Sequence, residues 1–159
     1  MLARLAAYEP RRPVIDGLEY REGLNAVGIE GGVATNVIPD ACTLVVNYRY
    51  APDITAEQAE AHVQEVFADC GVDEFVVDDH TGAEMPGLSH PAAKAFMEAV
   101  GGVARPKFGW TDVARFGSLG VPAVNYGPGD PLFAHKRDEH VRVERITHCE
   151  ERLRSWLTS

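Results

Sequence analysis

Residues 41–50 constrain the fold most, because one set of alternate side chains in this stretch is apolar throughout. Successive side chains of a β-strand point to opposite faces, so every second residue shares a face. The apolar set consists of Cys42, Leu44, Val46 and Tyr48. The other face becomes polar toward its end, at Asn47 and Arg49. This pattern predicts a strand that packs one side on a core and stops at Pro52-Asp53.

Patterns on both sides of this strand predict a small α/β layer. Residues 24–29 predict a strand before it. After it, Thr55 and Gln58 have the spacing of a capping box, which marks the start of a helix. The apolar face of that helix would hold Ala59, Val63, Val66, Phe67 and Cys70, with Gly71 ending it. A further short strand is predicted at residues 74–77, and this order of elements is typical of the α/β class.

The composition changes at residues 80–87, which contain two glycines and a proline, and this predicts a domain boundary. Beyond it we expect a helix capped by Ser89 and ended by Gly101-Gly102. A short helix at residues 113–118 and a strand at residues 122–126 follow. The apolar face of a final helix would hold Ile146, Cys149, Leu153, Trp156 and Leu157.

The charge and the cysteines exclude several classes of function. Acidic residues outnumber basic ones 24 to 15, so a nucleic-acid backbone would be repelled on average. No window of about 18 apolar residues exists, so we expect no membrane span. The three cysteines are odd in number and far apart. They predict neither a disulfide framework nor a thiolate zinc site, but buried thiols in a reducing, cytoplasmic compartment.

Chemistry could reside in residues 126–140, which lie between a predicted strand and a predicted helix. Ligands of α/β sheets bind at the carboxyl ends of strands, and imidazole is the commonest metal ligand. His135 is therefore a candidate ligand, although His135 and His140 could equally be solvated loop side chains. His62 is expected on the exposed face of its helix.

Two arginines are candidates for binding a substrate carboxylate. Arg115 follows Thr111 and could form a two-point fork on a carboxylate, or could be an ordinary surface arginine. Arg49 ends the main strand and could be only a solvated edge charge. Asn36 precedes that strand in a turn.

These segments together resemble one family. The order and spacing of five motifs resemble the C-terminal part of bacterial succinyl-diaminopimelate desuccinylases, members of the zinc aminoacylase and carboxypeptidase group of amidohydrolases. The motifs are Asn36-Val37-Ile38-Pro39-Asp40, Asn47-Tyr48-Arg49-Tyr50, Thr111-Asp112 with Arg115-Phe116, Gly127-Pro128-Gly129, and Ala134-His135 through Asp138-Glu139-His140-Val141. The resemblance implies an α/β chain in which residues 1–80 are the later part of a lid domain that forms homodimers. Residues 81–159 would be the C-terminal part of the catalytic domain.

The resemblance also implies a site. His135 would ligate one of two zinc ions, which cobalt could replace. Arg49 and Arg115 would hold carboxylates of a small N-acyl amino-acid substrate, while Asn36, Thr111 and Gly127 would line its pocket. The implied reaction is hydrolysis of N-succinyl-diaminopimelate to succinate and diaminopimelate, a step of lysine biosynthesis.

This sequence also departs from the family pattern. The family's His-x-Asp motif does not occur in it, and its glutamate base and oxyanion histidine have no counterpart. We therefore expect that the chain starts inside a larger protein, holds no catalytic residue, and alone neither binds zinc tightly nor hydrolyses amides. Three alternatives stay open: a deacylase for acetylornithine or another N-acyl amino acid, a non-catalytic dimerisation module or half of a split enzyme, and an unrelated α/β binding domain.

Overall fold

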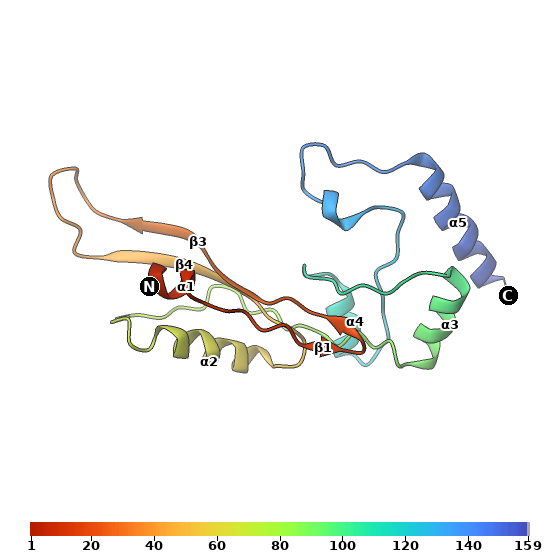
Figure 1. The fold of residues 1–159 in the computed structure, drawn as a ribbon, viewed down its shortest axis with the longest axis horizontal. Helices are drawn as coiled ribbons and strands as arrows, with labels where there is room; N and C mark the ends of the chain where they lie inside the picture. The colour runs from red at the N-terminus through yellow and green to blue at the C-terminus, as the bar shows by residue number, and fades with distance from the viewer. Residues whose placement is uncertain (159) are drawn as a thin grey trace. The chain divides into compact units, whose positions relative to one another are not determined.

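The computed structural model describes residues 1–158 and divides them into two compact units (Figure 1). The first unit comprises residues 1–85 and 106–110, and the second comprises residues 86–105 and those from 111 onward. The first unit contains α1 (Leu2–Ala6), β1 (Val14–Ile15), β2 (Leu18–Glu19), β3 (Gly23–Gly31), β4 (Cys42–Arg49) and α2 (Ala56–Phe67). The second contains α3 (Pro91–Val100), α4 (Val113–Ser118), the 3-10 helix η1 (Pro131–Phe133) and α5 (Val143–Leu157).

Strands β3 and β4 form an antiparallel hairpin whose ladder runs from Gly23 opposite Arg49 to Gly31 opposite Cys42. The alternation predicted for β4 is confirmed: its even-numbered residues from Leu44 to Tyr48 are half-buried, while the odd-numbered residues between them are exposed. The ladder shifts register between Ala26 and Gly28, which leaves Val27 as an extra residue and forms a β-bulge.

Strands β1 and β2 form a second, two-residue hairpin that the sequence patterns above did not predict. Its turn consists of Asp16 and Gly17, which have φ angles of 50° and 77°. An Asp-Gly pair with positive φ at both positions is the preferred two-residue turn, so the dipeptide was the signal that could have found it. Ile15 and Tyr20 next to this hairpin form a small core with Ala51.

Helix α2 begins and ends close to where the sequence predicts. The amide of Gln58 donates to the Thr55 hydroxyl over 3.2 Å, and the Thr55 amide donates to the Gln58 side chain over 2.8 Å. The capping box is therefore confirmed, and Ala59 and Phe67 lie buried on the predicted face. Helix α1 contacts β3, and Arg4 is paired with Asp69, just beyond the end of α2.

In the second unit, α3 and α5 pack through aromatic rings. The Phe96 ring lies 4.9 Å from that of Trp156 and 5.3 Å from that of Tyr126, both nearly edge-on. The N-cap of α3 is His90 rather than the predicted Ser89, because the His90 Nδ1 accepts from the Ala92 amide. Gly101 ends the helix with φ of 59°, as predicted. Helix α4 has the predicted bounds.

Three expectations about local structure are wrong. Residues 74–77 and 122–126 form no strand, because neither segment pairs with a neighbouring strand among residues 1–158. The cysteines are not buried: Cys42 is exposed at the start of β4, and Cys70 and Cys149 are half-buried free thiols. The α/β class itself is confirmed. Within residues 1–158, none of the helices combines the length and hydrophobicity needed to span a membrane.

Candidate functional site

The two candidate residues of the first unit lie at opposite ends of β4. Asn36 is exposed in the loop between β3 and β4, next to the strand's start. Arg49 is the last residue of β4, exposed, with its Nε donating to the Asn47 Oδ1 over 3.4 Å. A strand rises by about 3.3 Å per residue, so more than about 20 Å separates the two ends. Within one protomer, these side chains cannot bind the same carboxylate.

In the second unit, the candidate Thr111 is hydrogen-bonded to a residue two positions before the candidate Gly127. The Asn125 side chain donates to the Thr111 hydroxyl over 3.0 Å, and this bond fixes Thr111 beside the segment that leads into Gly127. Around Gly127, space is open within 4 Å of where a β-carbon would lie. Arg115 is exposed on α4, and its backbone carbonyl accepts from the Ser118 hydroxyl.

Hydrogen bonds from backbone amides to two acidic side chains of the same loop hold the segment that carries His135. The His135 amide donates to the Glu139 Oε2 over 3.0 Å, and the Leu132 amide donates to the Asp130 carboxylate over 3.0 Å. The His140 ring packs 4.7 Å from that of Phe133. His135 itself is exposed and has φ of 63°, a left-handed conformation that costs a non-glycine residue about 1–2 kcal/mol. Such conformations gather at functional sites, so His135 remains the candidate of this loop.

A metal site requires more ligands than this loop brings together. Among residues 1–158, no three histidine, cysteine, aspartate or glutamate side chains are grouped so that they could hold a metal ion. A catalytic zinc ion takes about three protein ligands. The described residues therefore do not form a three-ligand site by themselves, and the exposed His135 stays the sequence-predicted candidate for a ligand.

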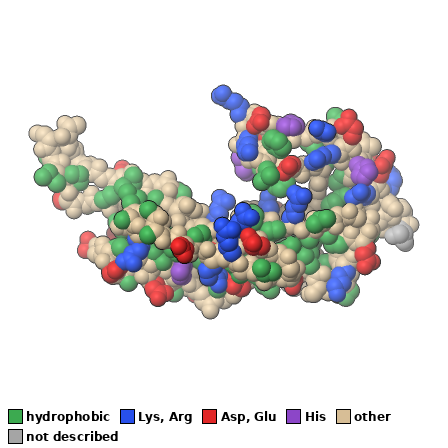
Figure 2. Space-filling view, in the orientation of Figure 1, with side chains coloured by type: hydrophobic (Ala, Val, Ile, Leu, Met, Phe, Trp, Pro, Cys, Tyr) green, Lys and Arg blue, Asp and Glu red, His purple; other side chains and the backbone are tan. Residues whose placement is uncertain are grey.

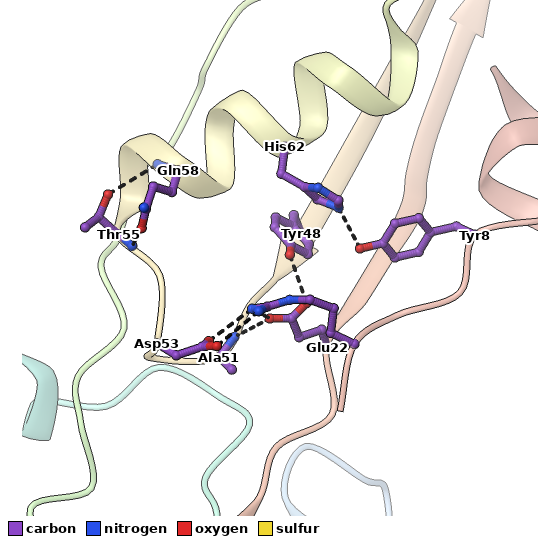
Figure 3. Close-up of polar contacts among 9 residues, drawn as sticks. Tyr8, Glu22, Tyr48, Ala51, Asp53, Thr55, Gln58 and His62 are labelled. Atoms are coloured by element: carbon purple, nitrogen blue, oxygen red, sulfur yellow. Dashed lines mark hydrogen bonds and ion pairs between the residues drawn. The ribbon is translucent and has the colours of Figure 1, made fainter. Parts of the chain in front are cut away.

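A polar cluster lies in the first unit around Glu22 and Arg11, two residues that the sequence patterns did not single out (Figure 3). Its centre is Glu22, whose side chain has no exposed surface. Its Oε1 accepts from the Arg11 Nη2 over 2.5 Å and from the Ala51 amide over 3.0 Å. Its Oε2 accepts from the Tyr48 hydroxyl over 3.0 Å and from the Arg11 Nε over 3.1 Å. Arg11 also bonds both oxygens of Asp53.

The electrostatics of this cluster favour a protonated Tyr48 and a charged Arg11. Burial, reinforced by the Glu22 carboxylate, raises the pKa of Tyr48 far above its usual range. Hydrogen bonds from Arg11 to Glu22 and Asp53 raise the pKa of that guanidinium, which stays charged. All donors and acceptors of the cluster therefore match, as buried charges require.

His62 closes the cluster on the side of α2, and the expectation that it lies on the exposed face is wrong. Its Nε2 is hydrogen-bonded to the Tyr8 hydroxyl at 2.9 Å, and its ring lies 5.4 Å from that of Tyr48 (Figure 3). The helical period predicts this placement, because His62 is three residues after the buried Ala59 and four before Val66. The cluster thus joins α2, β4 and the segment before β3.

Comparison with known proteins gives a family match within the first unit. Residues 12–73 match the family model described as the peptidase dimerisation domain. A Mycobacterium tuberculosis H37Rv protein provisionally named succinyl-diaminopimelate desuccinylase is 55% identical over 157 residues, which are 99% of this chain and 44% of that protein. The succinyl-diaminopimelate desuccinylase of Corynebacterium glutamicum is 46% identical over 161 residues, covering 99% of this chain and 44% of the enzyme.

A relative with a different name also matches. The acetylornithine deacetylase of Myxococcus xanthus is 31% identical over 133 residues, which cover 80% of this chain and 35% of that enzyme. The chain thus spans less than half the length of each of these relatives. Residues 12–73 thus match the dimerisation domain of M20 peptidases, and nearly the whole chain is similar to part of relatives named as desuccinylases.

Proposed function

We propose that the chain is the part of a cytoplasmic succinyl-diaminopimelate desuccinylase that carries the dimerisation domain and one metal-binding imidazole. The enzyme would hydrolyse N-succinyl-diaminopimelate to succinate and diaminopimelate in lysine biosynthesis. The observation that carries this proposal is the identity of 46% over 99% of the chain to a relative named for that activity. The acetylornithine deacetylase is less similar, at 31% over 80% of the chain.

The site residues act on the substrate's carboxylates and on one metal ion. Arg49 and Arg115 are exposed, and a guanidinium binds a carboxylate through two parallel hydrogen bonds. Thr111 and Gly127 would contact the substrate from the second unit, and Asn36 would contact it from the loop before β4, at the other end of that strand from Arg49. His135 is one zinc ligand. A bound zinc ion, or cobalt in its place, would polarise the amide carbonyl and lower the pKa of a bound water so that its hydroxide form is available as the nucleophile.

We propose that the remaining ligands and the general base are supplied by polypeptide outside residues 1–159, because a catalytic zinc ion takes about three protein ligands and His135 is the one candidate ligand that the resemblance implies. We therefore expect the isolated chain to bind zinc more weakly than micromolar and to be inactive. Calorimetric titration with zinc checks this, and a sub-micromolar dissociation constant for the isolated chain would contradict it.

A chimeric enzyme tests the activity. In it, this chain replaces the matching 161 residues of the Corynebacterium glutamicum enzyme, which supplies the rest of the polypeptide. The chimera should release succinate from N-succinyl-diaminopimelate, and should act far more slowly on acetylornithine. His135→Ala in the chimera should abolish activity, whereas Arg137→Ala in the same loop should not.

The chimera also separates the alternatives. Preference for acetylornithine would identify the chain as part of a deacetylase, which the similarity to the Myxococcus xanthus enzyme favours as second candidate. A chimera that forms dimers and binds zinc but cleaves neither substrate would favour a non-catalytic dimerisation module, which the match at residues 12–73 would explain.

A further inference from the structure

We infer that Glu22 is a positioning residue that fixes the end of β4 from which Arg49 reaches the substrate. The inference rests on the proposed function, in which Arg49 holds a substrate carboxylate. Glu22 would act only through the backbone on either side of Arg49, because the hydrogen bonds of its carboxylate go to Arg11, Tyr48 and Ala51.

The geometry places the two anchors of this carboxylate on both sides of Arg49. The Tyr48 hydroxyl and the Ala51 amide each donate to Glu22 over 3.0 Å. Tyr48 precedes Arg49 directly, and Ala51 follows it by two residues, after β4 has ended. One side chain therefore holds the last residues of the strand and the first residues after it.

The ladder adds a third constraint from the same segment. Gly23, the residue after Glu22, lies opposite Arg49 in the pairing of β3 with β4. Because alternate side chains of a strand point to opposite faces, Tyr48 points toward Glu22 and α2 while Arg49 points away. Any movement of the Glu22 carboxylate would thus shift the backbone from which the Arg49 side chain leaves the opposite face.

Burial and charge hold the Glu22 carboxylate rigidly in place. The Glu22 side chain has no exposed surface, and Arg11 neutralises it while also bonding both oxygens of Asp53. Asp53 itself follows the end of β4 by four residues, so the network also holds the turn toward α2. A strand end in open solvent frays, whereas this one is fixed by charge-assisted hydrogen bonds. A preorganised arginine loses less entropy when it binds a carboxylate.

The test uses variants of the chimeric enzyme and of the full 159-residue chain. Glu22→Ala removes every anchor, and Glu22→Gln is the conservative variant, because its amide oxygen can still accept from the Ala51 amide. Glu19→Gln is the matched control: this carboxylate is half exposed and only pairs with Arg12 and Arg21 at the surface.

Glu22→Ala should raise the KM for N-succinyl-diaminopimelate about tenfold with kcat within about twofold, because uniform substrate binding is what is lost. Glu22→Gln should restore most of the affinity, and Glu19→Gln should match the parent. In a double-mutant cycle, Glu22→Ala should add nothing to the KM of Arg49→Ala, since a residue that acts through Arg49 has no effect without it.

A second variant keeps the inference testable if Glu22→Ala does not fold. Tyr48→Phe removes one anchor and keeps the ring, so it should raise KM less than Glu22→Ala and again only when Arg49 is present. In the full chain, hydrogen exchange of the Ala51 amide should speed up about tenfold in Glu22→Ala. It should speed up far less in Glu22→Gln, whose amide oxygen still accepts from the Ala51 amide, and not at all in Glu19→Gln.

The outcomes separate the inference from the proposed function. If Arg49→Ala raises KM but Glu22→Ala and Tyr48→Phe do not, the function stands and the positioning role is wrong. Additive effects of Glu22→Ala and Arg49→Ala, or a loss of kcat at constant KM, would also overturn the positioning role. If Arg49→Ala leaves KM unchanged in an active chimera, Arg49 does not bind the substrate, and the inference fails with that assignment.

Discussion

At the scale of single residues, Tyr48 and His135 have the most constrained surroundings, for opposite reasons. Tyr48 is held by contacts: its hydroxyl donates to a buried carboxylate and its ring packs against that of His62. His135 is held in an unfavourable backbone conformation at an exposed position, with φ of 63°. The first arrangement makes stability depend on pH, and the second makes it depend on the residue type.

The raised pKa of Tyr48 predicts a loss of stability in alkali. The folded chain holds this proton more tightly than the unfolded chain, so the unfolded state ionises first and is stabilised relative to the folded state as the pH rises above about 10. Tyr48→Phe removes this term, so its free energy of unfolding should fall less steeply with pH in that range. Urea unfolding between pH 8 and pH 11, values set by the usual tyrosine pKa of about 10, measures both slopes. Equal slopes would contradict the prediction.

Glycine should relieve the backbone strain at His135. Because glycine adopts positive φ at little cost, His135→Gly should be about 1 kcal/mol more stable than the matched variant Arg137→Gly, two residues along the same loop. Arg137 has no such conformation, so glycine there only adds freedom to the unfolded chain. Thermal unfolding of both variants checks this, and an equal or lower stability of His135→Gly would count against the strain.

Some of the residues of the site have a local sequence signal that predicts their placement, and others have none. Helical periodicity could have placed His62 on the packed face of α2, and the dipeptide Asp16-Gly17 could have revealed the first hairpin. The Glu22 cluster had no such signal, because its partners are separated by 11, 26 and 29 positions and meet only through the tertiary fold. The roles of Arg49, Arg115 and His135 stay predictions.

At the scale of elements, helices were predictable because their ends are specified locally. The capping box of α2 and the left-handed glycine after α3 are complete within a few residues of sequence. The short strands expected at residues 74–77 and 122–126 were not predictable in this way. A strand forms only when a neighbour accepts its backbone hydrogen bonds, and local apolar patterns contain no information about that neighbour.

The cap of α2 makes a measurable contribution. Thr55→Ala should lower the free energy of unfolding by about 1 kcal/mol, because the Gln58 amide then loses its side-chain acceptor. Gln64→Ala is the control on the same helix: its side chain is exposed and only bonds Glu60, so its removal should cost less than half as much. Equal losses in the two variants would mean that the cap contributes nothing specific.

At the scale of the whole molecule, the apolar side chains left exposed on the hairpin of β3 and β4 bear on assembly. Figure 2 shows apolar side chains along the visible face of this hairpin, and Val27 and Ile29 are 64% and 63% exposed. The hairpin lies within the peptidase dimerisation domain at residues 12–73. Exposed apolar surface in such a domain is typical of a subunit contact.

The full chain should therefore be a dimer in solution, and Ile29→Asp should convert it to a monomer by placing a charge in the contact. Val103→Asp is the control, because Val103 is 86% exposed but lies in the second unit. Light scattering after size exclusion gives both masses. A monomeric parent chain, or dissociation by Val103→Asp alone, would contradict this placement of the contact.

The extra residue of β3, Val27, decides which side chains of the strand lie on the side of the expected dimer contact. Before Val27, Leu24 and Ala26 lie opposite Tyr48 and Val46, whereas after it Ile29 lies opposite Leu44. On the side of β3 that faces the same way as Leu44, Val46 and Tyr48, the residues are therefore even-numbered before Val27 and odd-numbered after it. An uninterrupted alternation would have turned the carboxylate of Glu30 onto this side and Ile29 onto the other. A single inserted residue thus places Ile29 on the same side of the hairpin as Leu44 and leaves the carboxylate of Glu30 on the reverse side.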